Sequence, residues 1–225
     1  MTTRVVALVP AHDEADRIEA TFAGLCSLGA LDEVVVVDDG STDGTASVAL
    51  AAGATVLAIR RRVGKGRALE GALRRLPPAD VWLLADGDLG ATAGALGPVL
   101  EEVLDGRADM AIGVLPEAPG GGFGLVKEAA GRAIRALAGF EAAAPLSGQR
   151  AIRRDVLDAC RPIAGGFGVE TAMTIDAVRA GFRVVEVPAN LAHRPTGRDV
   201  RGFAHRGRQG VDILLAVLPR AIGLR

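Results

Sequence analysis

The first 113 residues alternate short apolar segments with longer segments of helical periodicity, and this alternation limits the fold more than any other feature of the sequence. Residues 33–38, EVVVVD, are apolar on both faces, as expected for a parallel strand that is covered on both sides. The same reasoning predicts strands at 4–10, 33–38, 54–59, 80–85, 109–113 and 183–187, and helices at 14–28, 42–52, 66–76, 95–104, 125–137, 154–160 and 169–180. Strands that alternate with helices at this spacing form βαβ units. The sequence therefore predicts an α/β fold with a mainly parallel, Rossmann-like sheet flanked by helices.

The chain changes character after residue 113. Residues 116–124, PEAPGGGFG, are too rich in glycine and proline for a helix or a regular strand, and they predict a mobile loop that can close over a bound molecule. We expect one domain over residues 1–192, with halves at 1–113 and 114–192, followed by a basic C-terminal tail and helix at 193–225. Residues 211–218 are apolar but too short to span a bilayer. The sequence leaves open whether they pack on the domain, lie in a membrane interface or form a homodimer contact.

Charge and composition exclude several classes of protein. The formal net charge of −1 does not favour a nucleic-acid-binding protein. The first residues, MTTRVVALVPAHDE, reach charged side chains too early for a signal peptide, and no run of about 18 apolar residues predicts a membrane-spanning helix. Cys26 and Cys160 lie in apolar surroundings without metal-ligand spacing, so we predict two buried, reduced thiols. These features predict a cytoplasmic protein that at most contacts the inner face of a membrane peripherally.

The segment VVVVDDGSTDGT, residues 34–45, places two carboxylates directly after a predicted strand. In parallel sheets, ligands bind beyond the carboxyl ends of the strands. Asp38 and Asp39 can therefore accept hydrogen bonds from a nucleobase and from ribose hydroxyls. A turn followed by an N-cap at Ser41 or Thr42 explains residues 41–43 equally well. It does not explain why two successive aspartates are present.

A second acidic motif, LLADGDLG at residues 83–90, places Asp86 and Asp88 after another predicted strand. Two carboxylates at this spacing can bind one hard divalent cation, which neutralises a diphosphate. Short D-x-D motifs also occur by chance and form turns. Their position at the same sheet edge as residues 38–43 favours the metal-binding interpretation.

The basic segment RRRVGKG, residues 60–66, places Lys65 between two glycines at the start of a predicted helix. Glycines that flank a cation at a helix N-terminus suit phosphate binding. The segment does not match the G-x-x-x-x-G-K-[ST] pattern of a Walker A loop. A solvent-exposed basic turn explains it equally well.

Four segments, in this order and at this spacing, resemble the family 2 glycosyltransferases and their relatives with the GT-A fold. They are VPAHDEADRI at 9–18, VVVVDDGSTDGT at 34–45, GKGRALEGAL at 64–73 and ADGDLG at 85–90. The resemblance implies that the base and ribose pocket is lined by Pro10, Ala11, Asp13 and Asp39. It further implies that Asp86 contacts ribose or metal and that Asp88 holds the metal. We add Glu14 and Lys65 to the predicted donor-binding residues.

The second half supports this resemblance. Residues 145–157, PLSGQRAIRRDVL, look like the acceptor-side segment of this fold, which implies acceptor binding near Ser147 and Gly148. Together with 165–188 and AHRPTGRD at 192–199, they are similar to polyprenyl-phosphate sugar transferases and glucosyl-3-phosphoglycerate synthases. In the latter, a histidine at the position of His193 completes the metal site, and an imidazole beside two carboxylates is a sensible shell for a divalent metal. Arg194 and Arg198 can bind the donor diphosphate, a phosphorylated acceptor or an anionic membrane.

Glu170 follows Gly-Phe-Gly and lies near the predicted cleft. It can accept the acceptor's proton as a general base, or orient the acceptor. A glutamate on an early helical turn can also simply complement the helix dipole. The phosphoglycerate enzymes carry segments that this chain lacks and retain configuration, whereas family 2 normally inverts, so the sequence leaves the stereochemical outcome open.

We therefore predict a glycosyltransferase that uses Mg²⁺ or Mn²⁺ and a UDP- or GDP-sugar, with Glu170 and Asp88 as catalytic residues. The predicted acceptor is anionic, with polyprenyl phosphate ahead of a small phosphorylated metabolite. One alternative is a nucleotidyltransferase, but such enzymes place a G-x-G-x-R loop after the first strand, where this chain has PAHDEADR. Another is a nucleotide-sugar-binding module without turnover. The presence of both Asp88 and His193 argues against it.

Overall fold

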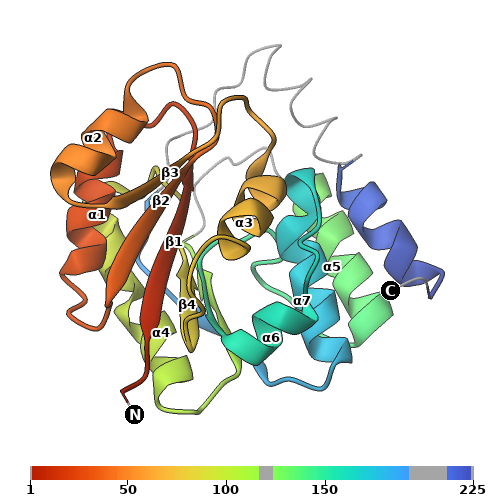
Figure 1. The fold of residues 1–225 in the computed structure, drawn as a ribbon. Helices are drawn as coiled ribbons and strands as arrows, with labels where there is room; N and C mark the ends of the chain where they lie inside the picture. Colours follow the sequence, from red (N-terminus) through yellow and green to blue (C-terminus); the bar gives the residue numbers. More distant parts are fainter. Residues whose placement is uncertain (1, 117–123, 193–211, 224–225) are drawn as a thin grey trace.

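The computed structural model describes residues 2–116, 124–192 and 212–223, and their strands form one sheet in the order β3-β2-β1-β4-β6-β5-β7 (Figure 1). The strands are β1 (Val5–Ala11), β2 (Glu33–Asp38), β3 (Thr55–Ala58), β4 (Val81–Leu84), β5 (Met110–Val114), β6 (Arg150–Arg153) and β7 (Val184–Pro188). The helices are α1 (Ile18–Cys26), α2 (Thr45–Ala52), α3 (Lys65–Leu73), α4 (Gly97–Leu104), α5 (Gly124–Ala138), α6 (Arg154–Ala159) and α7 (Val169–Arg179), with 3₁₀ helices η1 (Gly90–Leu96) and η2 (Gly166–Gly168). A further helix at residues 212–221 is called the C-terminal helix.

Parallel pairing dominates the sheet, as predicted. β1 pairs in parallel with β2 and β4, β2 with β3, and β5 with β7. β6 is antiparallel to both β4 and β5. Its sequence, RAIR, lacks the apolar run of the other strands, and the sequence pattern does not predict it. Because β6 comes from the predicted second half and lies between two strands of the first, the two halves share one sheet.

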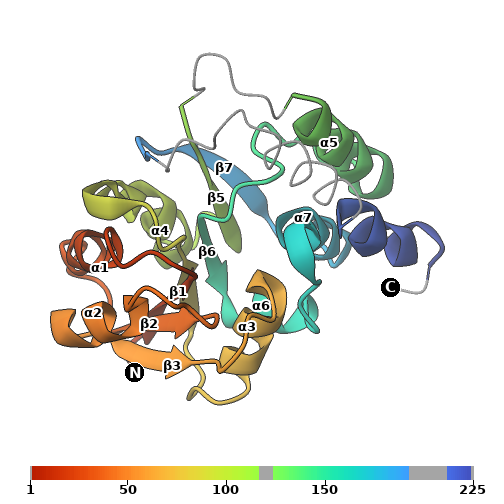
Figure 2. The same ribbon diagram turned by 90° about the horizontal axis from the view of Figure 1, so that it is seen from above.

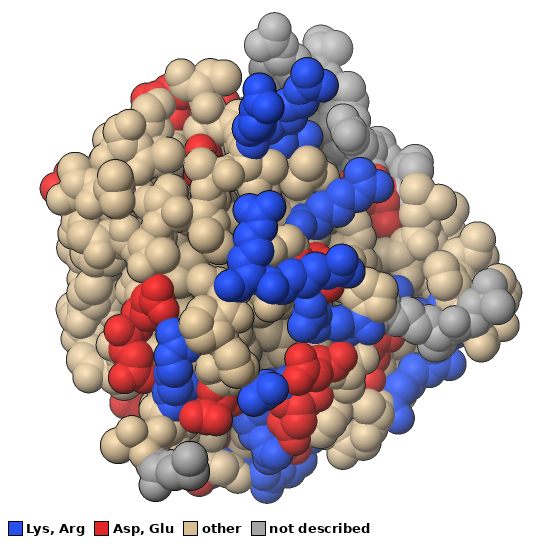
Figure 3. Space-filling view, in the orientation of Figure 1, with Lys and Arg blue, Asp and Glu red and all other residues tan. Residues whose placement is uncertain are grey.

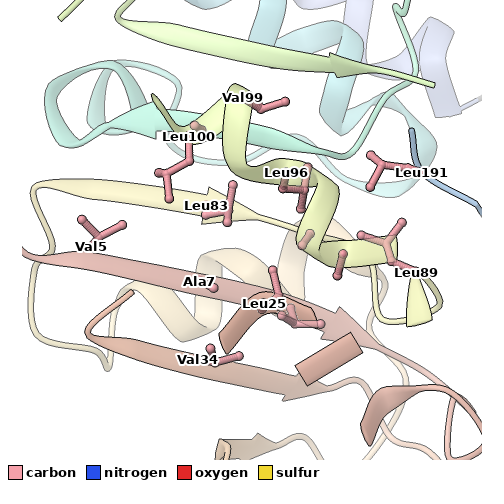
Figure 4. Close-up of a cluster of buried hydrophobic side chains, with 14 of the residues drawn as sticks. Val5, Ala7, Leu25, Val34, Leu83, Leu89, Leu96, Val99, Leu100 and Leu191 are labelled. Carbon is pink, nitrogen blue, oxygen red and sulfur yellow. The ribbon is translucent and has the colours of Figure 1, made fainter. Parts of the chain in front are cut away.

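Helices cover both faces of the sheet (Figure 2). α1, α2 and α4 lie on one face, whereas α3, α6 and α7 lie on the other, with α5 packed against α7. The first face buries a core that includes Leu25 and Leu83 (Figure 4). The second buries Leu69, Trp82 and Met173. Neighbouring residues of β4 thus enter opposite cores, because successive side chains of a strand point to opposite faces.

α2 begins at Thr45, later than predicted, and the predicted N-cap at Ser41 or Thr42 is wrong. Gly44 precedes the helix with a φ of 90°, and the Asp43 carboxylate accepts the backbone N–H of Thr45 at 3.0 Å. Hydrogen bonds from the Thr45 hydroxyl and from neighbouring backbone groups lower the pKa of Asp43. The earlier residues are not available for capping, because they bind partners in the neighbouring loops.

The C-terminal helix packs on α7 through one face. Ile213 and Ala216 are buried there, and the buried Arg220 donates a hydrogen bond to Asp176 at 2.7 Å. Of the three alternatives for this apolar stretch, packing on the domain is therefore the one that the structure shows. The opposite face exposes four large aliphatic side chains, Leu214, Leu215, Leu218 and Ile222. Contact with a membrane or with a second copy stays a prediction.

Among the described helices, none is long and apolar enough to cross a bilayer.

The two cysteines are free thiols, as predicted, but they differ in exposure. Cys160 is buried, and its Sγ lies 3.5 Å from the carbonyl oxygen of Met173. Cys26 is exposed. The prediction of a buried thiol is wrong at Cys26, because this last residue of α1 does not face the sheet.

Glu70 of α3 joins the first half of the chain to the second. Its carboxylate accepts hydrogen bonds from the Arg161 guanidinium at 2.9 Å and from the backbone N–H of Ile163 at 3.1 Å. The hydrogen bond from Arg161 is the main reason why the pKa of Glu70 is lowered to about 2, although burial opposes the shift.

This lowered pKa predicts a loss of stability in acid. Relative to an ordinary value of 4.5, the shift corresponds to at most about 3 kcal/mol of stabilisation. That stabilisation is fully present above about pH 4.5 and is lost as the pH falls towards 2, because the folded state then has to take up a proton it binds weakly. Urea unfolding measured from pH 7 to pH 2.5 should show a flatter pH dependence for Glu70→Gln than for the wild type. Glu128→Gln, which removes an exposed ion pair with Arg132, should leave the profile unchanged.

Candidate active site

The carboxyl ends of β1, β2 and β4 meet at one edge of the sheet, which faces the viewer in Figure 2. Residues 12–17, 39–44 and 85–89 follow these strands. Pro10 and Ala11, which the resemblance places in the base pocket, lie at this edge as the last two residues of β1. The candidate site is built from these three loops, the start of α3 and the start of α7.

Asp38 and Asp39 are both buried and both bind the protein itself. Asp38 accepts the backbone N–H of Ser41 at 3.1 Å and also its hydroxyl. Asp39 accepts the backbone N–H groups of Val63 at 2.7 Å and Gly64 at 2.8 Å, one on each carboxylate oxygen. The two successive aspartates therefore shape two different loops, which explains why both are present. A direct contact of Asp39 with a nucleotide stays a prediction.

The loop after β1 is tied to the loop after β2. Asp13 has a φ of 55°, which is uncommon for a residue other than glycine. Its N–H donates to the Ser41 hydroxyl at 3.0 Å, and its carboxylate accepts the N–H of Thr42 at 2.8 Å. The N–H of Glu14 donates to the Thr45 hydroxyl at 2.9 Å. Asp13 and Glu14 thus lie at the edge of the sheet where the donor is predicted to bind. Their hydrogen bonds fix the loop after β1 against residues 41–45.

Lys65 links two parts of the site. Its Nζ donates to Asp86 Oδ1 and to Glu170 Oε1, both at 2.7 Å. Burial alone lowers the pKa of Lys65, but the charges of these two carboxylates and their hydrogen bonds outweigh it, so the pKa is raised above that of an ordinary lysine. The Lys65 and Asp86 side chains are 25% and 26% exposed, whereas that of Glu170 is 9% exposed. A protonated ammonium is therefore held between two carboxylates, in a cluster whose Lys65 and Asp86 side chains are partly exposed.

The loop before β6 completes this cluster. Gln149 is fully buried; its Nε2 donates to Asp86 Oδ2 at 2.6 Å, and its Oε1 accepts the Asp86 N–H at 3.0 Å. A methyl group at Gly148 would lie 2.4 Å from Lys65 Nζ and 2.9 Å from both Asp86 carboxylate oxygens, so a side chain there would displace the groups of this cluster. Ser147 donates its hydroxyl to a backbone carbonyl of β5 at 2.6 Å, which is a structural contact. Of the two predicted acceptor residues, Gly148 borders the cluster and Ser147 supports it.

The D-x-D turn is held by α1. The buried Thr21 donates its hydroxyl to the carbonyl of Gly87 and accepts the N–H of Gly90, both at 2.8 Å. Arg17 Nη1 donates to the carbonyl oxygen of Asp88 at 3.1 Å. These contacts fix the backbone of Asp88 at the sheet edge. Asp88 itself is partly exposed.

The predicted metal ligands are only partly described. Within residues 2–116, 124–192 and 212–223, no three His, Cys, Asp or Glu side chains group closely enough to hold a metal ion. Both oxygens of Asp86 bind protein groups, Lys65 and Gln149. His193, the third predicted ligand, lies outside the described residues, as do Arg194 and Arg198. A metal site of Asp86, Asp88 and His193 stays a prediction.

Arg150 is a buried cation beneath the site. It is 1% exposed; its Nε donates to the carbonyl of Ser147 at 2.9 Å and its Nη1 to the Thr174 hydroxyl at 3.0 Å. Its Nη2 has no hydrogen-bond partner in the described part of the chain. Burial lowers the pKa of Arg150 to about 10, and the negative charge of Glu170 is the main opposing influence. Arg150 thereby joins the loop before β6 to α7.

Thr21, Gln149 and Arg150 are parts of the site that the sequence did not single out. Gln149 and Arg150 lie within PLSGQRAIRRDVL, so their neighbourhood was predicted but their roles were not. Thr21 carries no signal, because a threonine inside an amphipathic helix has no distinctive pattern.

Basic side chains gather over α3 and the loop before it (Figure 3). The exposed arginines are Arg60, Arg61 and Arg62 in that loop, Arg67 in α3, and Arg74 and Arg75 directly after α3. The arginines therefore fit the solvent-exposed turn considered above, whereas Lys65 turns towards the acidic cluster.

Known proteins resemble this chain over most of its length. Residues 6–161 match the model of a family described as glycosyl transferase family 2. Glycosyltransferase AglJ of Haloferax volcanii is 30% identical over 203 residues, which cover 87% of this chain and 65% of AglJ. An undecaprenyl-phosphate mannosyltransferase of Micrococcus luteus is 30% identical over 215 residues, which cover 86% of each protein. Thus the chain spans just under two thirds of the length of AglJ.

A solved structure extends the comparison to the fold. It is glucosyl-3-phosphoglycerate synthase from Mycobacterium tuberculosis in complex with Mn²⁺, UDP and phosphoglyceric acid. The match has a TM-score of 0.80 and 28% identity, and it covers 97% of this chain and 78% of the synthase. The GT-A architecture expected from the sequence is therefore confirmed. The family model, the sequence relatives and the shared fold agree, and the chain belongs to glycosyl transferase family 2.

Proposed function

We propose that this protein transfers a sugar from a UDP- or GDP-sugar to a phosphorylated acceptor and that it uses Mg²⁺ or Mn²⁺. The observation that carries the proposal is the cluster of Lys65, Asp86 and Glu170, which the fold assembles at the carboxyl edge beside the D-x-D turn. The synthase of similar fold holds Mn²⁺, UDP and a phosphorylated acid. The mannosyltransferase relative is named for a polyprenyl phosphate acceptor.

The ligand types at the D-x-D turn suit a hard divalent cation. Asp86 and Asp88 offer carboxylate oxygens, the ligand type that Mg²⁺ and Mn²⁺ prefer. These two residues would hold the ion, with His193 as the predicted third ligand. When bound, the ion supplies positive charge against the diphosphate of the donor.

The remaining chemistry falls to the chain itself. Lys65 holds a fixed positive charge beside Asp86 and orients the Glu170 carboxylate by a hydrogen bond of 2.7 Å. Glu170 is placed to accept the proton of the acceptor hydroxyl or phosphate, or to orient that group. Gly148 leaves space beside the ammonium, because a side chain there would collide with Lys65.

The test is a calorimetric titration with UDP, GDP and their sugars, with Mn²⁺ and with chelator. Product formation is then measured with two acceptors, a short-chain polyprenyl phosphate and 3-phosphoglycerate. Metal-dependent binding of one nucleotide, followed by transfer to one acceptor, would support the proposal. Binding without transfer to either acceptor would favour the non-catalytic binding module, and no binding at all would refute the donor site.

Glu170→Gln is expected to lower turnover by at least about 10²-fold, because the amide cannot accept a proton. Donor affinity in the calorimeter should stay within about twofold of the wild type, since the amide still accepts the hydrogen bond from Lys65. Glu102→Gln, at a partly exposed residue of α4 that pairs with Arg107, serves as the control and should turn over normally. Near-normal turnover of Glu170→Gln would contradict the general-base role and would favour an orienting role or simple complementation of the helix dipole.

A further inference from the structure

The C-terminal helix closes over the turn that precedes α7. A methyl group at Gly168 would lie 2.2 Å from Cβ of Ala216 and 2.8 Å from the carbonyl oxygen of Asp212. Gly166 has a φ of 61°, and a methyl group there would lie 2.2 Å from the Asp212 carboxylate. The start of the C-terminal helix therefore lies directly on η2, in van der Waals contact with its backbone.

A buried ion pair anchors the other end of the same helix. Arg220 Nε donates to Asp176 Oδ1 at 2.7 Å, and its Nη2 donates to the second carboxylate oxygen. Arg179 Nη1 donates to the carbonyl oxygen of Arg220 at 2.8 Å. The Arg220 and Asp176 side chains are only 3% and 9% exposed. Removing one partner of such a pair leaves a buried charge without compensation. The pair therefore holds the C-terminal helix in one position relative to α7.

The C-terminal helix adds little to the hydrophobic core. Of its apolar side chains, Ile213 and Ala216 are buried, and neither belongs to the two core clusters. Its three leucines, Leu214, Leu215 and Leu218, are exposed. Its contacts thus constrain the geometry of α7 more than they increase the buried apolar area.

We propose that the C-terminal helix positions Glu170, with Arg220 and Asp176 as positioning residues. η2 ends at Gly168 and α7 begins at the next residue, so Glu170, the second residue of α7, lies two positions after the turn that the C-terminal helix covers. The C-terminal helix contacts α7 near both ends, at η2 and at Asp176. These contacts hold the Glu170 carboxylate at 2.7 Å from Lys65 Nζ. Small displacements of a reacting group lower turnover steeply. This inference rests on the proposed function, in which Glu170 acts on the acceptor.

The experiment compares three variants with the wild type. Gly168→Ala pushes the C-terminal helix away from η2, and Arg220→Lys keeps the charge but loses the two-pronged hydrogen bond to Asp176. Gly131→Ala on α5 is the control, because its nearest contact would be 3.7 Å away. For each protein, kcat and donor affinity are measured at a temperature where circular dichroism shows the folded state. The coupling free energy between Lys65→Met and Glu170→Gln is measured by urea unfolding in each background.

We expect kcat to fall at least about tenfold in Gly168→Ala and less in Arg220→Lys, with donor affinity within twofold of the wild type. The Lys65–Glu170 coupling should fall by about half or more in Gly168→Ala. If Gly168→Ala does not fold, Arg220→Lys carries the comparison. Wild-type kcat and coupling in the folded variants would overturn the inference, as would a parallel loss of kcat and donor affinity. If the wild type itself shows no turnover, the proposed function fails, and the coupling energies still decide whether the helix positions Glu170.

Discussion

Asp88→Ala is expected to abolish metal-dependent binding of the donor and to lower kcat/KM by at least about 10³-fold. The magnitude follows from the proposed role, because a divalent cation contributes several kcal/mol of charge stabilisation at a leaving diphosphate. The backbone of the turn should survive the change, since Thr21 holds Gly87 and Gly90, and Arg17 donates a hydrogen bond to the carbonyl oxygen of Asp88, which alanine keeps. The loss should therefore appear in binding and turnover without a large loss of stability.

The measurement is calorimetric titration of nucleoside diphosphate in the presence of Mn²⁺, with Asp105→Ala as the matched control. Asp105 lies at the end of α4, and its exposed carboxylate pairs with Arg107. Asp105→Ala should bind and turn over normally. Unchanged Mn²⁺-dependent affinity in Asp88→Ala would remove Asp88 from the metal site.

Gly66→Ala is expected to destabilise the fold by about 3 kcal/mol or more. Two effects oppose each other at this position. Alanine is a better helix former than glycine by about 1 kcal/mol, and Gly66 lies in the first turn of α3. However, its methyl group would lie 1.8 Å from the carbonyl oxygen of Ala164 and 2.9 Å from a methyl of Val169. A backbone carbonyl cannot move aside as the end of a flexible side chain can, so the collision outweighs the propensity.

Gly71→Ala on the same helix separates the two effects. A methyl group at Gly71 meets no atom within 4 Å, so only the helix propensity remains. We expect Gly71→Ala to raise the free energy of unfolding by roughly 0.5–1 kcal/mol. Urea unfolding midpoints of the two variants should therefore move in opposite directions. A Gly66→Ala protein as stable as the wild type would show that α3 is not packed tightly against residue 164.

Much of the fold could be predicted from the sequence because the parallel strands are locally distinctive. The strand predicted from the run EVVVVD begins and ends at the same residues as β2. The prediction is accurate here because a strand buried on both faces needs a continuous apolar run. β6 could not be predicted in this way. Its residue Arg150 is a fully buried arginine whose charge is accommodated by partners from a loop and from α7, and local pattern does not reveal such partners.

The candidate site divides in the same manner. The sequence by itself determined that acidic loops follow β1, β2 and β4, and in a parallel sheet those loops share one edge. Only the tertiary structure decided which groups meet there. It pairs Lys65 with Glu170, 105 positions away in the chain, and it gives both oxygens of Asp39 to backbone N–H groups. The physical reason is that periodicity reports which face of an element is buried, whereas the partners of a polar group depend on how separate elements pack.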